Sequence, residues 1–368
     1  MKLKSLAVSN FRSLADARLP LHDLNVIVGP NGSGKTALLE VLHMVHCASQ
    51  RELSKFLDER GGFQAVLHRT NGRVHDALMQ IRIEFDAQSE QKSLDPDTFV
   101  MTLADQTVGY VVREALLEKL TPKGNREGAL RLHGGPDTAT ELAYFAVGGD
   151  ASPPIMKFLA GIRLYGALDV GPRSIVRLPQ TLTPAQAPGP NGEHLYSALY
   201  NLRISAPEIF ERLTVLLQQS FPGFKRLELP VVGAGQVTLA WYERDSNTPF
   251  YANQLSEGTL RYLWLVTILL TPQRPPLLLL DEPELSLHPA LLRLLAALLQ
   301  DAALTTQIVV ATQSSDLIGW LMPEEVLIAD KEDGKTLFTW AADLDLKAWL
   351  DEYTLRDLWL MGNLGGRP

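Results

Sequence analysis

The residues with the most specific chemistry in this sequence are Gly29-Pro30-Asn31-Gly32-Ser33-Gly34-Lys35-Thr36, which fit the phosphate-binding pattern G-x-x-x-x-G-K-[ST]. The glycines allow a tight backbone turn whose successive N–H groups point inward around an anion. A lysine at this position reaches the β- and γ-phosphates of a nucleotide, and the hydroxyl after it ligates Mg²⁺. The pattern therefore predicts a site for ATP and Mg²⁺ formed by Asn31, Gly32, Ser33, Gly34, Lys35 and Thr36, with Thr36 also on the metal.

The flanking residues have the composition that such a loop needs. Leu24 to Val28 is apolar and β-branched, which indicates a buried parallel strand. Ala37 to Leu42 is rich in strong helix formers, so a helix is expected directly after the loop. The N-terminus of that helix would add a partial positive charge beneath the phosphates.

Two acidic residues follow a second buried strand. Leu277 to Leu280 is wholly apolar, and Asp281 and Glu282 come next. A strand ending in this way delivers carboxylates to the sheet edge where the phosphates lie. We expect Asp281 to hold Mg²⁺, mostly through water, and Glu282 to orient or deprotonate the attacking water. By itself such a strand end is often only solvated, so the assignment depends on its pairing with the phosphate-binding loop.

The composition limits the class of protein. The chain has 368 residues, of which 46% are hydrophobic, so two or three lobes with a sizeable core are expected. The formal net charge of -8 does not indicate a basic nucleic-acid surface, although a local basic groove stays possible. The single cysteine, Cys47, excludes an internal disulfide and suits a reducing cytoplasm. The longest apolar helix candidate, Leu263 to Leu270, is too short to cross a membrane.

Periodicity predicts the remaining elements. Helices are expected over 193–219, 256–270 and 289–303, a loop over 178–192, and a polar hairpin with a helix over 331–368. Strands are expected over 2–9, 16–21, 77–85, 98–112, 142–147, 225–243, 277–280 and 307–311.

Several motifs together resemble those of ABC-type ATPases of the SMC/RecF/OLD-like branch, often called AAA family ATPases. The segments that carry the resemblance are Asn10-Phe11-Arg12-Ser13, Asn253-Gln254-Leu255-Ser256-Glu257-Gly258-Thr259, Asp281-Glu282-Pro283-Glu284-Leu285-Ser286-Leu287-His288-Pro289, Ile308-Val309-Val310-Ala311-Thr312-Gln313-Ser314 and the tail Tyr353 to Pro368. The resemblance covers 1–45 and 195–368 well and 50–190 poorly. The segment Ile308 to Ser314 resembles the switch of that branch. The residues that follow it are too few for the Toprim nuclease domain of OLD-type relatives, so such a domain is not expected here.

The resemblance implies a mechanism in which two protomers bind two nucleotides head to tail. The segment Asn253 to Thr259 resembles the ABC signature, L-S-x-G. Its Ser256 and Gly258 would then cap the γ-phosphate held by the loop of the other protomer. Glu282, Lys35 and Gln313 would be the catalytic residues. Members of this branch usually have His at the switch position, where this chain has Gln313. A glutamine side chain cannot carry a proton or a positive charge as histidine can, which favours slow hydrolysis.

The expected fold is α/β: an ABC-type P-loop NTPase head with a mixed β-sheet, a variable inserted lobe and a helical signature lobe. The expected domains are 1–85 with the phosphate-binding loop, 86–190 inserted, 191–330 with the signature and second acidic motif, and 331–368 as a short extension.

The expected function is a cytoplasmic ATP-hydrolysing switch, acting in DNA repair or anti-phage defence. Its expected partners are a second copy of the chain, in a homodimer or higher oligomer, and a nuclease or toxin. DNA remains a partner that the net charge does not indicate, and no membrane is expected. The alternatives are the ATPase subunit of a membrane transporter and a scaffold that binds ATP without hydrolysing it.

Three weaker signals stay open or are set aside. Arg12 could approach the nucleotide or be a surface residue in a turn, and Gln64 is a weak candidate for the glutamine between the lobes. His43, His46 and Cys47 have helical spacing but are expected to be core residues rather than metal ligands. Asp343 and Asp345 are interpreted as a solvated turn.

Overall fold

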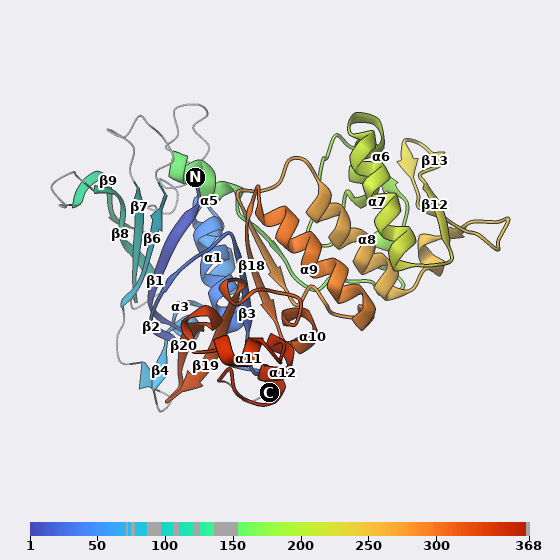
Figure 1. Cartoon of the computed structure of the whole chain (residues 1–368). Helices are drawn as coiled ribbons and strands as arrows, with labels where there is room; N and C mark the ends of the chain where they lie inside the picture. Colours follow the sequence, from blue (N-terminus) through green and yellow to red (C-terminus); the bar gives the residue numbers. More distant parts are fainter. Residues whose placement is uncertain are drawn as a thin grey trace. The chain divides into compact units, whose positions relative to one another are not determined.

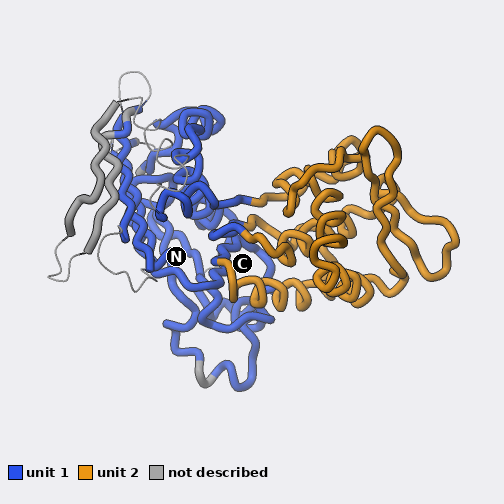
Figure 2. The backbone as a smooth tube through the Cα atoms, turned by 90° about the horizontal axis from the view of Figure 1, so that it is seen from above, with its two compact units in different colours: residues 1–164, 275–279, 307–368 blue, residues 165–274, 280–306 orange. Residues whose placement is uncertain are grey.

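The computed structural model of the chain describes residues 1–70, 73–74, 78–86, 97–105, 110–120, 126–135 and 154–365. The chain divides into two units, 1–164 with 275–279 and 307–368, and 165–274 with 280–306 (Figure 2). Among the described residues, no helix is long and apolar enough to cross a membrane. The predicted strand over 142–147 lies outside the described residues.

A six-stranded mixed sheet carries the phosphate-binding loop. Its strands, in the order β10-β17-β18-β3-β19-β20, are Arg163–Tyr165, Leu277–Asp281, Gln307–Thr312, Leu24–Val28, Val326–Glu332 and Lys335–Trp340 (Figure 1). β3 pairs in parallel with β18 on one side and with β19 on the other, whereas β19 and β20 are antiparallel. All five side chains of β3 are buried, which explains why this strand has no polar alternation. The predicted mixed sheet is confirmed.

A second six-stranded sheet of the first unit is a meander. Its order is β2-β1-β6-β7-β8-β9, with strands Leu14–Pro20, Leu3–Phe11, Leu78–Phe85, Thr98–Asp105, Tyr110–Leu120 and Arg126–Gly135. Buried and more exposed residues alternate along β6, so only one face of this strand is directed towards the core. The predicted hairpin of 2–9 with 16–21 is confirmed, while the strand expected over 98–112 is two strands, β7 and the start of β8.

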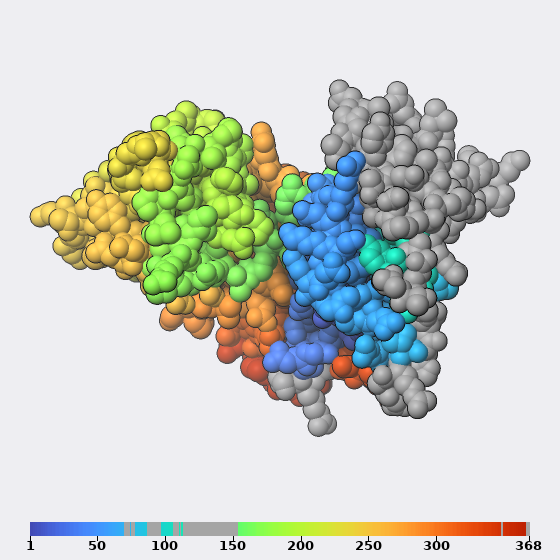
Figure 3. Space-filling view, turned by 180° about the vertical axis from the view of Figure 1, so that it is seen from behind, coloured from blue at the N-terminus to red at the C-terminus, as the bar shows by residue number. Residues whose placement is uncertain are grey.

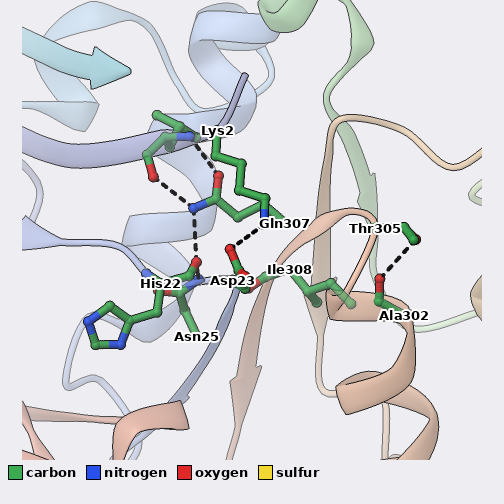
Figure 4. A network of polar contacts seen from close by, with 9 residues as sticks. Lys2, His22, Asp23, Asn25, Ala302, Thr305, Gln307 and Ile308 are labelled. Carbon is green, nitrogen blue, oxygen red and sulfur yellow. Dashed lines mark hydrogen bonds and ion pairs between the residues drawn. The ribbon is translucent and has the colours of Figure 1, made fainter. Parts of the chain in front are cut away.

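The two sheets are joined at the starts of β3 and β18 by a buried glutamine (Figure 4). Gln307 is 1% exposed; its Oε1 accepts from the Leu3 N–H at 2.8 Å. Its Nε2 lies 2.8 Å from the carbonyl oxygen of Leu3 and 2.9 Å from that of His22. Asn25 Nδ2 is 2.8 Å from the same His22 carbonyl and 2.9 Å from that of Ile308. These bonds connect backbone groups of β1, of the turn before β3 and of β18, so they help to fix β18 beside β3.

Helix α1, Lys35–Ser49, lies at the centre of the first unit's core. Eleven of its residues are buried, and it packs against α5, Pro154–Gly161, and against β18. α2, Leu53–Asp58, and α3, Phe63–Val66, lie on the surface of this unit (Figure 3). The other short elements are β4 Arg69–Thr70, β5 Arg73–Val74, α10 Ser315–Ile318, η4 Pro323–Glu325, η5 Ala341–Asp343, α11 Lys347–Leu350 and α12 Leu355–Leu360.

The second unit is built mainly from four helices. They are α6 Leu195–Ser205, α7 Pro207–Ser220, α8 Glu257–Leu270 and α9 Pro289–Ala303. Its short strands and 3-10 turns are η2 Ile175–Arg177, β11 Gln180–Thr181, β12 Phe224–Glu228, β13 Val231–Gly233, β14 Gln236–Val237, β15 Ala240–Glu243, β16 Phe250–Tyr251 and η3 Ala252–Gln254. The predicted helices over 256–270 and 289–303 are confirmed. The helix expected over 193–219 is two helices, because Pro207 starts a new one.

The observed division differs from the four predicted segments. The predicted boundary between 330 and 331 falls inside β19, whose apolar start, Val326 to Ala329, is buried in the nucleotide sheet. The hairpin β19–β20 is therefore part of the sheet that carries the phosphate-binding loop. The polar residues Lys331 to Lys335 suggest an independent hairpin in the sequence only because they form its exposed turn.

Candidate nucleotide-binding site

The phosphate-binding loop follows β3 and leads into α1, as expected. Gly32 and Gly34 have φ angles of +77° and +102°, in the left-handed region that favours glycine. A Cβ on Gly29 would lie 2.3 Å from the carbonyl oxygen of Ala329, so only glycine allows β19 to approach this closely. Asn31, Gly32 and Thr36 are exposed, and Ser33 is 1% exposed. The backbone therefore has the conformation that the motif requires.

Lys35 is the first residue of α1 and is 6% exposed. Its Nζ donates to the carbonyl oxygens of Gly29 at 2.7 Å and Pro30 at 2.9 Å. Buried ammonium groups require such partners, because desolvation is costly. The bonds hold the lysine against the first two residues of the loop, which is the position from which a bound phosphate could be contacted.

The switch residue Gln313 lies beside the loop. In the pairing of β18 with β3, Thr312 is opposite Val28, so Gln313 and Gly29 leave neighbouring strands at the same sheet edge. Two hydroxyl groups shape this turn: Thr312 Oγ1 accepts from the Ser314 N–H at 2.9 Å, and Ser314 Oγ caps α10. Gln313 is exposed, and the pairing of the two strands brings it close to the loop at this sheet edge.

Asp281 is the last residue of β17, and Glu282 follows it. β17 is next to β18 in the same sheet that contains β3. Glu282 has a φ angle of +49°, which is uncommon for a residue with a side chain. Such backbone strain is concentrated at functional sites, where it fixes the direction of a side chain. Both residues are half-buried.

In the second unit, the signature forms the start of α8. Ser256 is the N-cap, and its Oγ accepts from the Thr259 N–H at 3.1 Å. A Cβ on Gly258 would lie 2.7 Å from the carbonyl oxygen of Ser286. Glycine is therefore needed here for close contact with the turn that follows Glu282. The structure thus joins the signature helix to the second acidic motif through Gly258 and Ser286, whose φ angle is +62°.

Arg177 holds the backbone in front of the signature. Its Nε donates to the carbonyl oxygen of Val170 at 2.7 Å, and Nη1 donates to those of Ala252 at 3.0 Å and Leu255 at 2.9 Å. One guanidinium thus fixes three backbone groups of segments that have little regular structure. The sequence contains no signal for this role, because nothing local distinguishes Arg177 from a surface arginine.

Arg12 has a partner on α1. Its Nε lies 3.0 Å from Glu40 Oε2 and its Nη2 lies 3.1 Å from Oε1, while Arg60 Nε also contacts Oε1 at 3.1 Å. The guanidinium of Arg12 thus lies against the helix that follows the loop. Its approach to the nucleotide stays a prediction. The amide of Gln64 donates to Asp105 Oδ2 at 2.9 Å, within the first unit.

The histidines and cysteine of α1 are partly or wholly buried. Burial lowers the pKa of His43 to about 4 and raises that of Cys47 to about 11. His46 Nδ1 bonds to the carbonyl oxygen of Leu159 at 3.0 Å. No group of three His, Cys, Asp or Glu residues that could hold a metal occurs among the described residues. Asp343 and Asp345 are exposed, as a solvated turn requires.

Two family descriptions match this chain. "AAA ATPase domain" matches residues 1–116, and "AAA domain, putative AbiEii toxin, Type IV TA system" matches residues 178–319. The OLD nuclease of Thermus scotoductus is 56% identical over 123 residues, which are 33% of this chain and 21% of that protein. The DNA replication and repair protein RecF of Proteus mirabilis is 32% identical over 141 residues, 37% of this chain and 36% of that protein. The chain therefore spans about a fifth to a third of the length of these relatives.

Solved structures with the same fold are heads of SMC proteins. An SMC head bound to the C-winged helix domain of ScpA superposes with a TM-score of 0.60 at 14% identity, covering 95% of this chain and 100% of that one. The SMC head from Pyrococcus furiosus, bound to the C-terminal domain of ScpA, gives 0.58 at 12% identity, covering 95% and 98%. The fold is that of an ABC-type P-loop NTPase head, and the sequence matches support an ATPase of the SMC/RecF/OLD-like kind.

Proposed function

We propose that this chain is an ATP-dependent switch that binds ATP with Mg²⁺ and closes as a head-to-tail dimer. Slow hydrolysis by Glu282 then reopens the dimer. The observation that carries the proposal is the phosphate-binding loop, with Gly32 and Gly34 in left-handed conformations and Lys35 buried against the loop backbone. The backbone amides and the start of α1 offer positive charge where a triphosphate needs it.

The roles of the other residues follow from their places in the two units. Thr36 and Asp281 would ligate Mg²⁺, because a hydroxyl and a carboxylate are the oxygen ligands that this ion prefers. Ser256 and the N–H groups at the start of α8 would cap the γ-phosphate bound by the other protomer. Each protomer contains one loop and one signature, so two complete sites require two copies of the chain.

The proposed setting is DNA repair or anti-phage defence, with a nuclease or toxin as partner. It is supported by the similarity to a RecF protein, whose name states DNA replication and repair, and to an OLD nuclease. The bound ScpA domains of the SMC heads show that heads of this fold can carry a protein partner. Because the net charge is -8, we expect DNA binding, where it occurs, to use a local basic groove rather than the surface as a whole.

A second candidate is a scaffold that binds ATP without turning it over. Gln313 favours it, because an amide at the switch can hydrogen-bond to phosphate or water but cannot transfer a proton. Phosphate release by the wild-type protein, compared with Glu282→Gln, distinguishes the two. The switch requires a slow release that Glu282→Gln abolishes, whereas the scaffold shows the same background with both proteins.

The deciding experiment is the solution mass of the Glu282→Gln protein, measured by light scattering with and without Mg-ATP. We expect a monomer without ATP and a dimer with it, because the variant binds nucleotide but cannot reopen. Adding Ser256→Arg should prevent the dimer, since a bulky cation would occupy the capping position. Glu208→Gln, at an exposed position on α7, is the matched control and should behave as the wild type does. An unchanged mass with ATP demonstrably bound would refute the switch.

A further inference from the structure

A threonine of the C-terminal hairpin touches the phosphate-binding loop. Thr336, the second residue of β20, is 4% exposed, and its Oγ1 lies 2.8 Å from the carbonyl oxygen of Ser33. The same Oγ1 lies 2.7 Å from Ser13 Oγ, and the Thr336 N–H donates to the Ser13 carbonyl at 2.8 Å. Two segments from opposite ends of the sequence thus meet at the loop.

The chemistry of the groups decides the direction of the hydroxyl bonds. A carbonyl oxygen can only accept, so the single proton of Thr336 Oγ1 goes to Ser33. The proton between the two hydroxyls must then come from Ser13, whose Oγ donates to Thr336 Oγ1. The Thr336 hydroxyl thus donates one hydrogen bond and accepts another. Because Ser33 is buried, its carbonyl oxygen needs such a partner from the protein.

The bond to Ser33 fixes more than one carbonyl. The Ser33 carbonyl and the Gly34 N–H belong to the same planar trans peptide, so they point in opposite directions. Holding the carbonyl toward β20 therefore directs the Gly34 N–H to the other side of the loop backbone. The contact is also close: a Cβ on Gly34 would lie 2.1 Å from Thr336 Oγ1 and 2.7 Å from Ser13 Oγ.

We propose that Thr336 and Ser13 are positioning residues for phosphate binding, which orient the Ser33–Gly34 peptide so that its N–H donates to the nucleotide. This inference rests on the proposed function of the loop. It makes the N-terminal turn and the β19–β20 hairpin part of the binding machinery without either contacting the ligand. A peptide group oriented in advance binds more tightly, because its rotation need not be restricted when the nucleotide arrives.

The test is the affinity for Mg-ATP, measured by titration with a fluorescent ATP analogue and competition with ATP. Thr336→Val keeps the shape and the backbone bonds but removes the hydroxyl, and we expect about tenfold weaker binding. Thr336→Ser restores the hydroxyl and should bind within about twofold of the wild type. Thr339→Val, an exposed threonine on the same strand, is the matched control and should have no effect.

The fold is monitored by urea unfolding without nucleotide. If Thr336→Val does not fold, Ser13→Ala removes the hydrogen bond between the two hydroxyl groups from the other segment and should weaken binding by about threefold. Wild-type affinity in folded Thr336→Val, or in Ser13→Ala, would overturn the inference, as would a Thr336→Ser protein as weak as Thr336→Val. These outcomes differ from failure of the proposed function, in which the wild type and Lys35→Ala would both fail to bind Mg-ATP.

Discussion

Replacing Arg177 by lysine tests whether one guanidinium organises the signature. Arg177 donates to three carbonyl oxygens, of Val170, Ala252 and Leu255, at 2.7, 3.0 and 2.9 Å. Val170 and Ala252 are 3% and 1% exposed, so solvent is a poor substitute partner there. A lysine ammonium is a single point of donation and cannot span the three groups as the planar guanidinium does.

The expected cost follows from the number of bonds lost. If the lysine keeps one bond, two charge-assisted bonds disappear, at about 1.5 kcal/mol each, so the local stability falls by about 3 kcal/mol. Because opening of the segment controls amide exchange, the protection of residues 255–259 should fall about a hundredfold. The assay is hydrogen–deuterium exchange of peptides that cover this segment, together with the ATP-dependent mass of Arg177→Lys combined with Glu282→Gln.

Arg173→Lys is the matched control, because Arg173 is an exposed arginine of the same segment. It should leave both exchange and dimer formation unchanged. We expect Arg177→Lys to form the dimer only at higher protein concentration, while its monomer binds Mg-ATP normally through the first unit. Protection of residues 255–259 equal to that of the wild type would refute the reasoning, since the guanidinium would then not be holding the signature backbone.

Three further perturbations have defined outcomes. Gly258→Ala places a Cβ 2.7 Å from the Ser286 carbonyl oxygen, so the signature or the turn at Ser286 must move by about half an ångström. Light scattering should show that the affinity of the dimer falls about tenfold, while the affinity of the monomer for Mg-ATP is unchanged. Burial first, and then the charges of His46 and Arg60, lower the pKa of His43 from 6.5 to about 4. As the pH falls, the unfolded chain therefore binds the His43 proton before the folded chain does. The contribution of neutral His43 to the free energy of unfolding is fully present above pH 6.5, and about 1–3 kcal/mol of it is lost as the pH falls towards 4. Urea unfolding across this range should show a smaller slope for His43→Gln, and an equal slope would contradict the assignment. Glu40→Gln weakens the ion pairs with Arg12 and Arg60 and should lower the free energy of unfolding by about 1–2 kcal/mol. Glu324→Gln, at an exposed position of the same unit, is the control and should change it little.

Local patterns determined the elements and the loop. The apolar run from Leu24 to Val28, the glycine spacing and the helix formers after Thr36 each act within a few residues, so the strand, the turn and α1 could be predicted. The same is true of β17 and of α8, whose N-cap is Ser256. The pairing of β18 with β3, which brings Gln313 beside the loop, was not predicted, because strand order in a sheet depends on contacts between distant segments.

The tertiary structure alone decided which distant residues support these motifs. Thr336 and Ser13 are 323 positions apart, and Arg177 reaches Leu255 across 78. In the sequence, nothing distinguishes Thr336 or Arg177 from the threonines and arginines of the surface. Their roles depend on the backbone groups that they contact in the folded chain, and not on their spacing along the sequence. The sequence by itself thus determined the parts of a nucleotide-binding head, since periodicity and glycine conformations are local. Packing determined how its loop and its signature are held, because those contacts exist only when the chain has closed.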